Sequence, residues 1–158
     1  MYSTRYSSPI GEILLLSDGE NLCGLSFNSQ KSDVDSIDDN DLEIFKKVIR
    51  WLDEYFEGQN PKIDFNLKVS GTDFRMKVWE LLSQIPYGET VTYGEIASRI
   101  SPTMSAQAVG GAVGANPIAI IIPCHRVMGK GNKLTGYAAG IDKKVELLKI
   151  ENGDDFAC

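Results

Sequence analysis

The sequence predicts an α/β (α+β) protein: a small N-terminal sheet-plus-helix domain, then a mostly helical domain with a helix-turn-helix. Strand-like apolar runs separated by turn residues occupy much of the first half, whereas helical patterns ended by Gly and Pro dominate the second half. The pattern changes near Ser70–Gly71. We therefore expect domains at 1–69 and 70–152, with a short acidic tail at 153–158.

The first domain is expected to be a scaffold. GEILLLS (11–17) and NLCGLSF (21–27), joined by the turn-forming DGEN, predict a hairpin. The acidic segment 32–40 predicts a mobile loop, and the alternating segment 63–69 predicts a half-buried strand. Between them, residues 41–58 predict a helix. Its apolar stripe has spacings of three and four: Leu42, Phe45, Ile49, Leu52 and Phe56.

The second domain opens with a helix and continues with a helix-turn-helix. TDFRMKVWELLSQIP offers Thr72 as an N-cap and a proline stop. TYGEIASRI begins with a capping box made by Thr92 and Glu95. SAQAVGGAVGAN (105–116) predicts a second short helix across a turn, which indicates a helix-turn-helix. The expected buried face of the first helix is Phe74, Val78, Leu81, Leu82 and Ile85.

The second helix of this pair is unusual because it consists almost wholly of Ala, Gly and Val. Glycines at 110, 111 and 114 each cost about 1 kcal/mol against alanine in a helix interior. Either the helix packs very tightly against its own protein, or another surface comes very close to it. A narrow groove, such as the minor groove of DNA, would require the second arrangement.

Composition and charge exclude several classes of protein. The longest apolar run, 118–122, is too short to span a bilayer, and the N-terminal residues do not form a secretory signal. Three scattered cysteines, Cys23, Cys124 and Cys158, argue against a disulfide framework and for a reducing, cytoplasmic location. A single histidine and the absence of paired ligand spacings argue against a zinc site.

The net charge of −6 is unevenly distributed. Residues 1–69 hold 7 basic and 13 acidic side chains, whereas residues 70–152 hold 9 basic and 7 acidic ones. The weakly positive second domain permits contact with nucleic acid but does not demand it.

IIIPCHRVMG (120–129) carries the strongest chemical signal. The preceding NPIAIIIP predicts a turn and a buried strand, so Cys124 would stand where that strand ends. An apolar flank alone raises the pKa of a thiol, but the neighbouring His125 and Arg126 favour the thiolate. We therefore expect a reactive thiol that is accessible from a cleft.

His125, the only histidine, is either a structural residue or a base for this thiol. A base must reach the thiol directly or through one water, and needs an acceptor on its other ring nitrogen. Glu151 is a candidate acceptor, because it continues the side of a helix that carries Leu147 and Leu148. The alternative is a solvated helix end before Gly153.

These motifs closely resemble the O6-alkylguanine-DNA alkyltransferases, also called methylated-DNA–protein-cysteine methyltransferases. The resemblance runs from about residue 72 to residue 151 and is carried by VTYGEIA, AVGGAVGANP, PCHRV, GYAAG and a glutamate after a double leucine. The first domain is similar only in layout. The resemblance implies a monomer that takes the alkyl group from O6-alkylguanine in double-stranded DNA, with O4-alkylthymine as a second candidate lesion. It also implies a single turnover, with no cofactor and no metal.

The resemblance also assigns roles. Cys124 would accept the alkyl group, His125 would take its proton through a water, and Glu151 would hold the histidine. Asn116 would be a hinge, and Tyr93 would donate a hydrogen bond to the guanine. The recognition helix would enter the minor groove and flip the base. DNA and base contacts would come from Ala106, Gln107, Gly110, Gly111, Ala115, Arg126, Val127, Tyr137 and Ala138, with the carbonyls of Cys124 and Val127 reading the exocyclic amine.

Two positions depart from the family pattern. Gln107 stands where an arginine usually fills the gap left by the flipped base, so flipping or DNA affinity is expected to be weaker. Ala139 replaces a glycine of the tract commonly written GYxGG, and its methyl group is expected to restrict bulky alkyl groups.

Two other functions remain open from the sequence. A DNA-binding module without chemistry, such as an alkyltransferase-like lesion sensor, would bind the lesion without taking its methyl group. A cysteine hydrolase built from Cys124, His125 and Glu151 would turn over ester or amide substrates.

Overall fold

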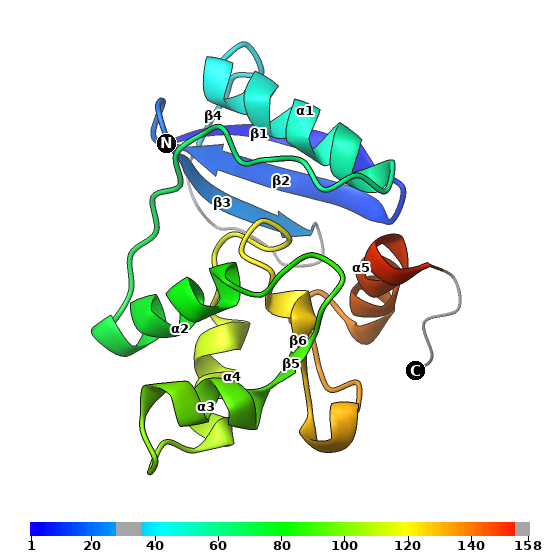
Figure 1. Ribbon diagram of the computed structural model, residues 1–158. Coiled ribbons are helices and arrows are strands. Elements are labelled where there is room, and N and C mark those ends of the chain that lie inside the picture. Colours follow the sequence, from blue (N-terminus) through cyan, green and yellow to red (C-terminus); the bar gives the residue numbers. More distant parts are fainter. Residues whose placement is uncertain (28–35, 154–158) are drawn as a thin grey trace. The chain divides into compact units, whose positions relative to one another are not determined.

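The computed structural model describes residues 1–27 and 36–153, which fall into two compact units, Met1–Val69 and Ser70–Cys158 (Figure 1). Part of the predicted acidic loop, the predicted tail beyond residue 153 and Cys158 lie outside the described residues. The mixed α/β fold class predicted from the sequence is confirmed. Within the described ranges, no helix is both long and apolar enough to cross a membrane.

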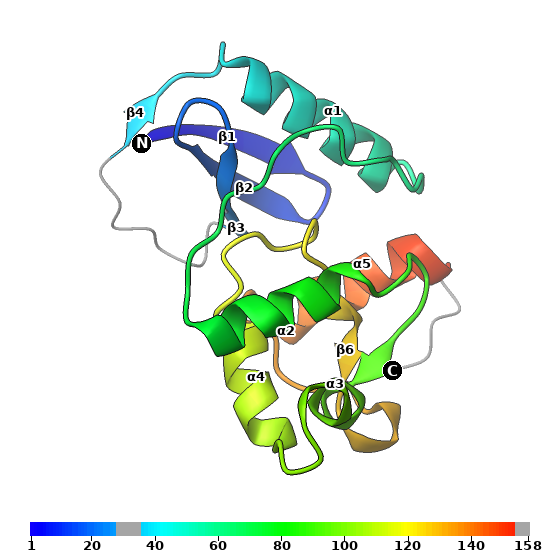
Figure 2. The same ribbon diagram turned by 60° about the vertical axis from the view of Figure 1, so that its left-hand side comes forward.

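Unit 1 is a four-stranded sheet covered on one face by a helix (Figure 2). The order of the strands is β3-β2-β1-β4, and the three longer strands are antiparallel. Helix α1 (Glu43–Phe56) contacts all three of them. The strands are β1 (Tyr2–Ser8), β2 (Gly11–Ser17), β3 (Leu22–Phe27) and β4 (Ile37–Asp38). The core between sheet and helix contains Ile13, Leu15, Leu25, Phe27, Phe45, Val48 and Leu52.

The strand predicted over 63–69 is wrong. This segment meets the edge of β3 at one place only, a bridge between Leu67 and Leu22, and Ile63 is 47% exposed. The predicted mobile loop is also wrong in its described part, because Ile37–Asp38 pair in parallel with β1.

Helix α1 presents a different face to the sheet from the predicted stripe. Val48 and Tyr55 are buried, whereas Ile49 and Phe56 are only partly covered. Phe56 instead stacks on the ring of Tyr6, a residue of β1, with 6.3 Å between centroids.

Unit 2 begins with three helices that pack together. Helix α2 (Asp73–Ser83) starts at the predicted cap, where the Thr72 side chain accepts a hydrogen bond from the Arg75 amide. Helices α3 (Tyr93–Ile100) and α4 (Ala106–Gly114) contact each other across a turn, as the helix-turn-helix prediction requires. The buried indole of Trp79 on α2 donates to the Ala112 carbonyl on α4 at 2.9 Å, which fixes α4 against α2.

The rest of unit 2 surrounds the predicted thiol. A two-stranded parallel sheet joins β5 (Val91–Thr92) to β6 (Val127–Met128). The short 3-10 helices η1 (Cys124–Arg126) and η2 (Lys130–Asn132) flank β6, and helix α5 (Ile141–Asn152) packs on η1. The segment that contains Cys124 is therefore covered by α5 and continues directly into β6.

Candidate active site

The apolar run before Cys124 is buried, but it is not the strand that we predicted. Residues 118–122 form a tight turn, in which the Ile122 amide donates to the Ile118 carbonyl at 3.1 Å. Ile120 has φ +68°, a conformation that strains a β-branched residue. The Asn116 side chain holds the turn: its Nδ2 donates to the carbonyls of Ile118 and Ile122, and its Oδ1 accepts from the Ile118 amide. Asn116 thereby links the end of α4 to the start of η1.

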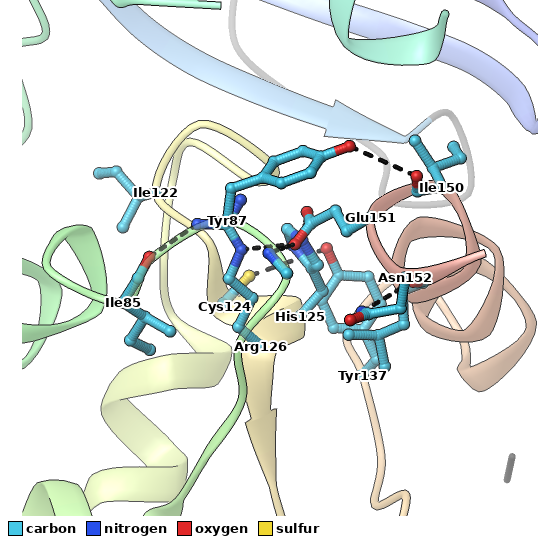
Figure 3. Close-up of polar contacts among 12 residues, drawn as sticks. Ile85, Tyr87, Ile122, Cys124, His125, Arg126, Tyr137, Ile150, Glu151 and Asn152 are labelled. Atoms are coloured by element: carbon cyan, nitrogen blue, oxygen red, sulfur yellow. Dashed lines mark hydrogen bonds and ion pairs between the residues drawn. The ribbon is translucent and has the colours of Figure 1, made fainter. Parts of the chain in front are cut away.

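Cys124 is less accessible than its sequence context predicts. It is the first residue of η1 and is only 7% exposed. Its Sγ lies 3.8 Å from the hydroxyl of Tyr137 (Figure 3). Burial raises the pKa of the Cys124 thiol, and hydrogen bonds from Asn116 and Tyr137 and the charge of Lys144 oppose this rise only in part. The resting sulfur is therefore a protonated thiol.

His125 and Glu151 form a buried pair. Nε2 of His125 lies 2.5 Å from Oε2 of Glu151, and both side chains are fully buried. Burial lowers the pKa of His125 more than Glu151 raises it, so the imidazole is neutral. Because the ionised Glu151 accepts only, we assign the ring proton to Nε2. Nδ1 then carries a free lone pair and has no hydrogen-bond partner among the described residues.

The guanidinium of Arg126 holds the other carboxylate oxygen of Glu151. Nε of Arg126 donates to Oε1 at 2.7 Å, and the Gly88 amide donates to the same atom at 3.3 Å. Although burial opposes ionisation, the hydrogen bond with His125 and the hydrogen bond and charge of Arg126 prevail and lower the pKa of Glu151 to about 2. Glu151 is thus an ionised, fixed acceptor for the histidine rather than a solvated helix end.

Arg126 was expected to favour the thiolate and to contact DNA, but its side chain is turned into the protein. Besides Glu151, its Nη1 donates to the Ile85 carbonyl at 2.8 Å, and its guanidinium lies over the Tyr87 ring. The cation that acts on the thiol is Lys144 instead.

Lys144 is the functional candidate that sequence reasoning missed. It is fully buried on α5, and its Nζ donates to the Val127 carbonyl at 2.6 Å. The sequence does indicate that Lys144 is buried, because residues 144, 147, 148 and 151 follow the i, i+3, i+4, i+7 pattern of a single helix face. Two charged residues on the buried face of a helix predict a polar site beneath it.

A groove of about 700 Å³ lies within unit 2, between the starts of α3 and α4 and the turn that follows β6. Four of the predicted residues line it: Tyr93, Ala106, Gln107 and Gly110. Its other wall includes Thr135 and Gly136. Since Tyr137 follows directly and contacts Sγ of Cys124, one loop borders both the groove and the thiol.

The other predicted contact residues are not among those that line this groove. Gly111 is exposed on α4 and Ala115 caps that helix, but neither lines the groove. Ala138 is exposed in the loop after Tyr137. The two carbonyls expected to read a base already accept protein hydrogen bonds, that of Val127 from Lys144 and that of Cys124 from the Val127 amide.

A helix-turn-helix beside a buried thiol–histidine–carboxylate array defines a class of DNA-binding proteins with a nucleophilic cysteine. Residues 73–153 match the model of the 6-O-methylguanine DNA methyltransferase DNA binding domain, and residues 1–70 match that of its ribonuclease-like domain. The chain belongs to the 6-O-methylguanine DNA methyltransferase family.

Similar proteins support this assignment along the whole chain. A methylated-DNA–protein-cysteine methyltransferase of Methanosarcina acetivorans is 48% identical, covering 96% of this chain and 98% of the relative. The corresponding protein of Haemophilus influenzae is 42% identical over 96% of this chain and 86% of its own. The crystal structure of Mycobacterium tuberculosis OGT in complex with DNA matches with a TM-score of 0.89 at 44% identity, covering 96% of this chain and 92% of that one.

Proposed function

We propose that this protein repairs DNA by moving the alkyl group of O6-alkylguanine onto Sγ of its own Cys124, once per molecule. The observation that carries the proposal is the pair of His125 and Glu151, which leaves Nδ1 of a neutral imidazole as a base in the residue next to the thiol. The names of the relatives, methylated-DNA–protein-cysteine methyltransferases, point to the same reaction.

The reaction begins with the removal of one proton. His125 accepts the proton of the Cys124 thiol at Nδ1, through one water, while Glu151 stabilises the imidazolium that forms. The sulfur then bonds to the alkyl carbon, and the bond between that carbon and O6 breaks. Its electrons remain on the guanine, which takes up a proton from water and becomes an ordinary base, while His125 gives the proton of the thiol back to solvent.

Positioning must add to the acceleration that ionisation of the thiol supplies. Full ionisation of a thiol with an ordinary pKa of about 8.5 gains about 30-fold at neutral pH, and the gain is larger for Cys124 because burial raises the pKa of its thiol. We assign the remainder to in-line placement of the base and to hydrogen bonds to the departing guanine, for which Tyr93 is the donor. Since Cys124 is almost completely buried, the loop that carries Tyr137 and Ala138 must move when the base enters the site.

Helix α4 is the proposed minor-groove element. A Cβ atom built on Gly111 or Gly114 would meet nothing within 4 Å, so packing within the protein does not require glycine at either position. Of the two explanations for this helix, close approach of an outside surface is therefore the better supported. Ala106, Gln107, Gly110 and Ala115 complete that surface. Double-stranded DNA is the partner, and one monomer suffices for the transfer.

The thioether product accounts for the single turnover. In the described part of the chain, the other cysteine, Cys23, belongs to the separate unit 1 and is half-buried, with its thiol directed to the Asn21 carbonyl. No other thiol of the described residues is therefore placed to restore Cys124.

The test counts repaired bases with a duplex containing O6-methylguanine in tenfold excess. We expect repair to stop at one guanine per chain, and Cys124→Ser to repair none. Continued turnover would overturn the single-use mechanism. Lesion binding without repair would indicate a sensor, and hydrolysis of a chromogenic ester a cysteine hydrolase.

A further inference from the structure

The groove beside α3 and α4 is lined almost entirely by uncharged residues. Of the described residues that line it, Lys130 alone carries a formal charge; the others are small, aromatic or neutral polar. Helix α4, with the sequence AQAVGGAVG, has no charged side chain at all. A helix that approaches DNA without a cation leaves the neighbouring phosphates to be neutralised by another element.

The backbone that carries Lys130 is held in place. The Gly129 amide donates to the Lys133 carbonyl at 2.7 Å, which closes the turn around η2. A Cβ at Gly129 would lie 2.5 Å from a methyl carbon of Thr135, so the turn packs tightly on that residue. The Thr135 hydroxyl in turn lies 3.5 Å from the hydroxyl of Tyr93, at the start of α3. Lys130 is therefore fixed relative to the same groove as Tyr93.

The side chain of Lys130 is available for a ligand. The residue is exposed, and none of the ion pairs among the described residues includes it. Lys144 is buried and Arg126 is engaged with Glu151, so neither of these cations of unit 2 can serve the groove.

We propose that Lys130 binds a backbone phosphate of the DNA strand that lies along this groove, and so supplies the charge that α4 lacks. An ammonium group on a flexible stem binds a phosphate as a point charge, with little dependence on sequence. The inference rests on the proposed function, because it takes DNA as the occupant of the groove. It adds a positioning residue that acts on affinity and not on the sulfur chemistry.

The experiment measures binding of an undamaged duplex by fluorescence anisotropy at several salt concentrations, so that no methyl transfer intervenes. One phosphate contact contributes about 0.9 to the slope of log K against log salt. We expect Lys130→Gln to bind more weakly than wild type and to have a slope shallower by about 0.9. The ratio of the wild-type association constant to that of Lys130→Gln should fall about 3.5-fold between about 50 and 200 mM salt. Lys130→Arg should restore the wild-type slope.

Lys77→Gln is the matched control, because Lys77 is an exposed lysine of α2 that does not line the groove. It should keep the wild-type slope. An unchanged slope in Lys130→Gln, or an equal decrease in Lys77→Gln, would overturn the inference. Methyl transfer by the wild-type protein is measured separately. If wild type transfers the methyl group but Lys130→Gln keeps the wild-type salt slope, only this inference is wrong. If the slope changes in Lys130→Gln but wild type transfers no methyl group, only the proposed function is wrong.

Discussion

Replacing Glu151 by Gln removes one charge from the centre of the site while keeping the shape of the side chain. The carboxylate is fully buried between His125 and Arg126, at 2.5 and 2.7 Å. Its pKa falls from 4.5 to about 2, which corresponds to about 3 kcal/mol of stability at neutral pH. Removing one partner of a buried ion pair costs about the same, because Arg126 is left uncompensated.

The pH dependence of the stability lost in Glu151→Gln follows from the direction in which the pKa of Glu151 is shifted. A carboxylate with a lowered folded-state pKa stabilises the protein fully above its unfolded pKa of 4.5, and loses that contribution as the pH falls toward 2. We therefore expect Glu151→Gln to be about 3 kcal/mol less stable than wild type at pH 7. The difference should shrink steadily between pH 4.5 and pH 2.

Urea unfolding followed by circular dichroism measures both quantities, and single-turnover methyl transfer measures the chemistry. Without the carboxylate charge that stabilises its imidazolium form, His125 is a weaker base, so transfer should slow by about 100-fold or more. Glu146→Gln, an exposed position on the same helix, is the control and should change stability by less than about 0.5 kcal/mol. Equal stabilities of Glu151→Gln and wild type at pH 7, or transfer within twofold of wild type, would refute the reasoning.

Three further substitutions test other parts of the site. Asn116→Ala removes three hydrogen bonds from the strained turn and should lower the free energy of unfolding in urea by about 3 kcal/mol. A decrease under about 1 kcal/mol would show that the turn is stable without the Asn116 side chain. Lys144→Met removes the cation that lowers the pKa of Cys124, so iodoacetamide labelling of the thiol should require higher pH; an unmoved profile would contradict this. Gln107→Arg adds a cation to the groove and should steepen the salt dependence of DNA binding by about 0.9; an unchanged slope would place α4 away from DNA.

The parts of the fold that the sequence predicts well are those determined by neighbouring residues. Thr72 and Thr92 both accept hydrogen bonds from the amide three residues later, so a local signal sets the start of α2 and of α3. Strand β1 carries no such signal. YSTRYSS is mostly polar, and it becomes a strand because β2 and β4 pair with its two edges.

In the site, too, some features are predictable from neighbouring residues and others depend on contacts between distant ones. The sequence identifies Glu151 as a candidate partner of His125, because a carboxylate stands where a helix face is expected to be buried. Burial alone did not distinguish a strand from a turn over 118–122; the hydrogen bonds of Asn116 decide in favour of the turn. Likewise, the adjacency of Arg126 to Cys124 in the chain predicted contact with the thiol, but in a tight 3-10 turn neighbouring side chains point in different directions.

The most direct measurement is to locate the transferred group by peptide mass mapping after reaction with a duplex containing O6-methylguanine. We predict one methyl group per chain, carried entirely by the peptide that contains Cys124, and none on Cys23 or Cys158. A methyl group on either of those cysteines, or full repair of the DNA with the Cys124 peptide unmodified, would contradict transfer to this sulfur.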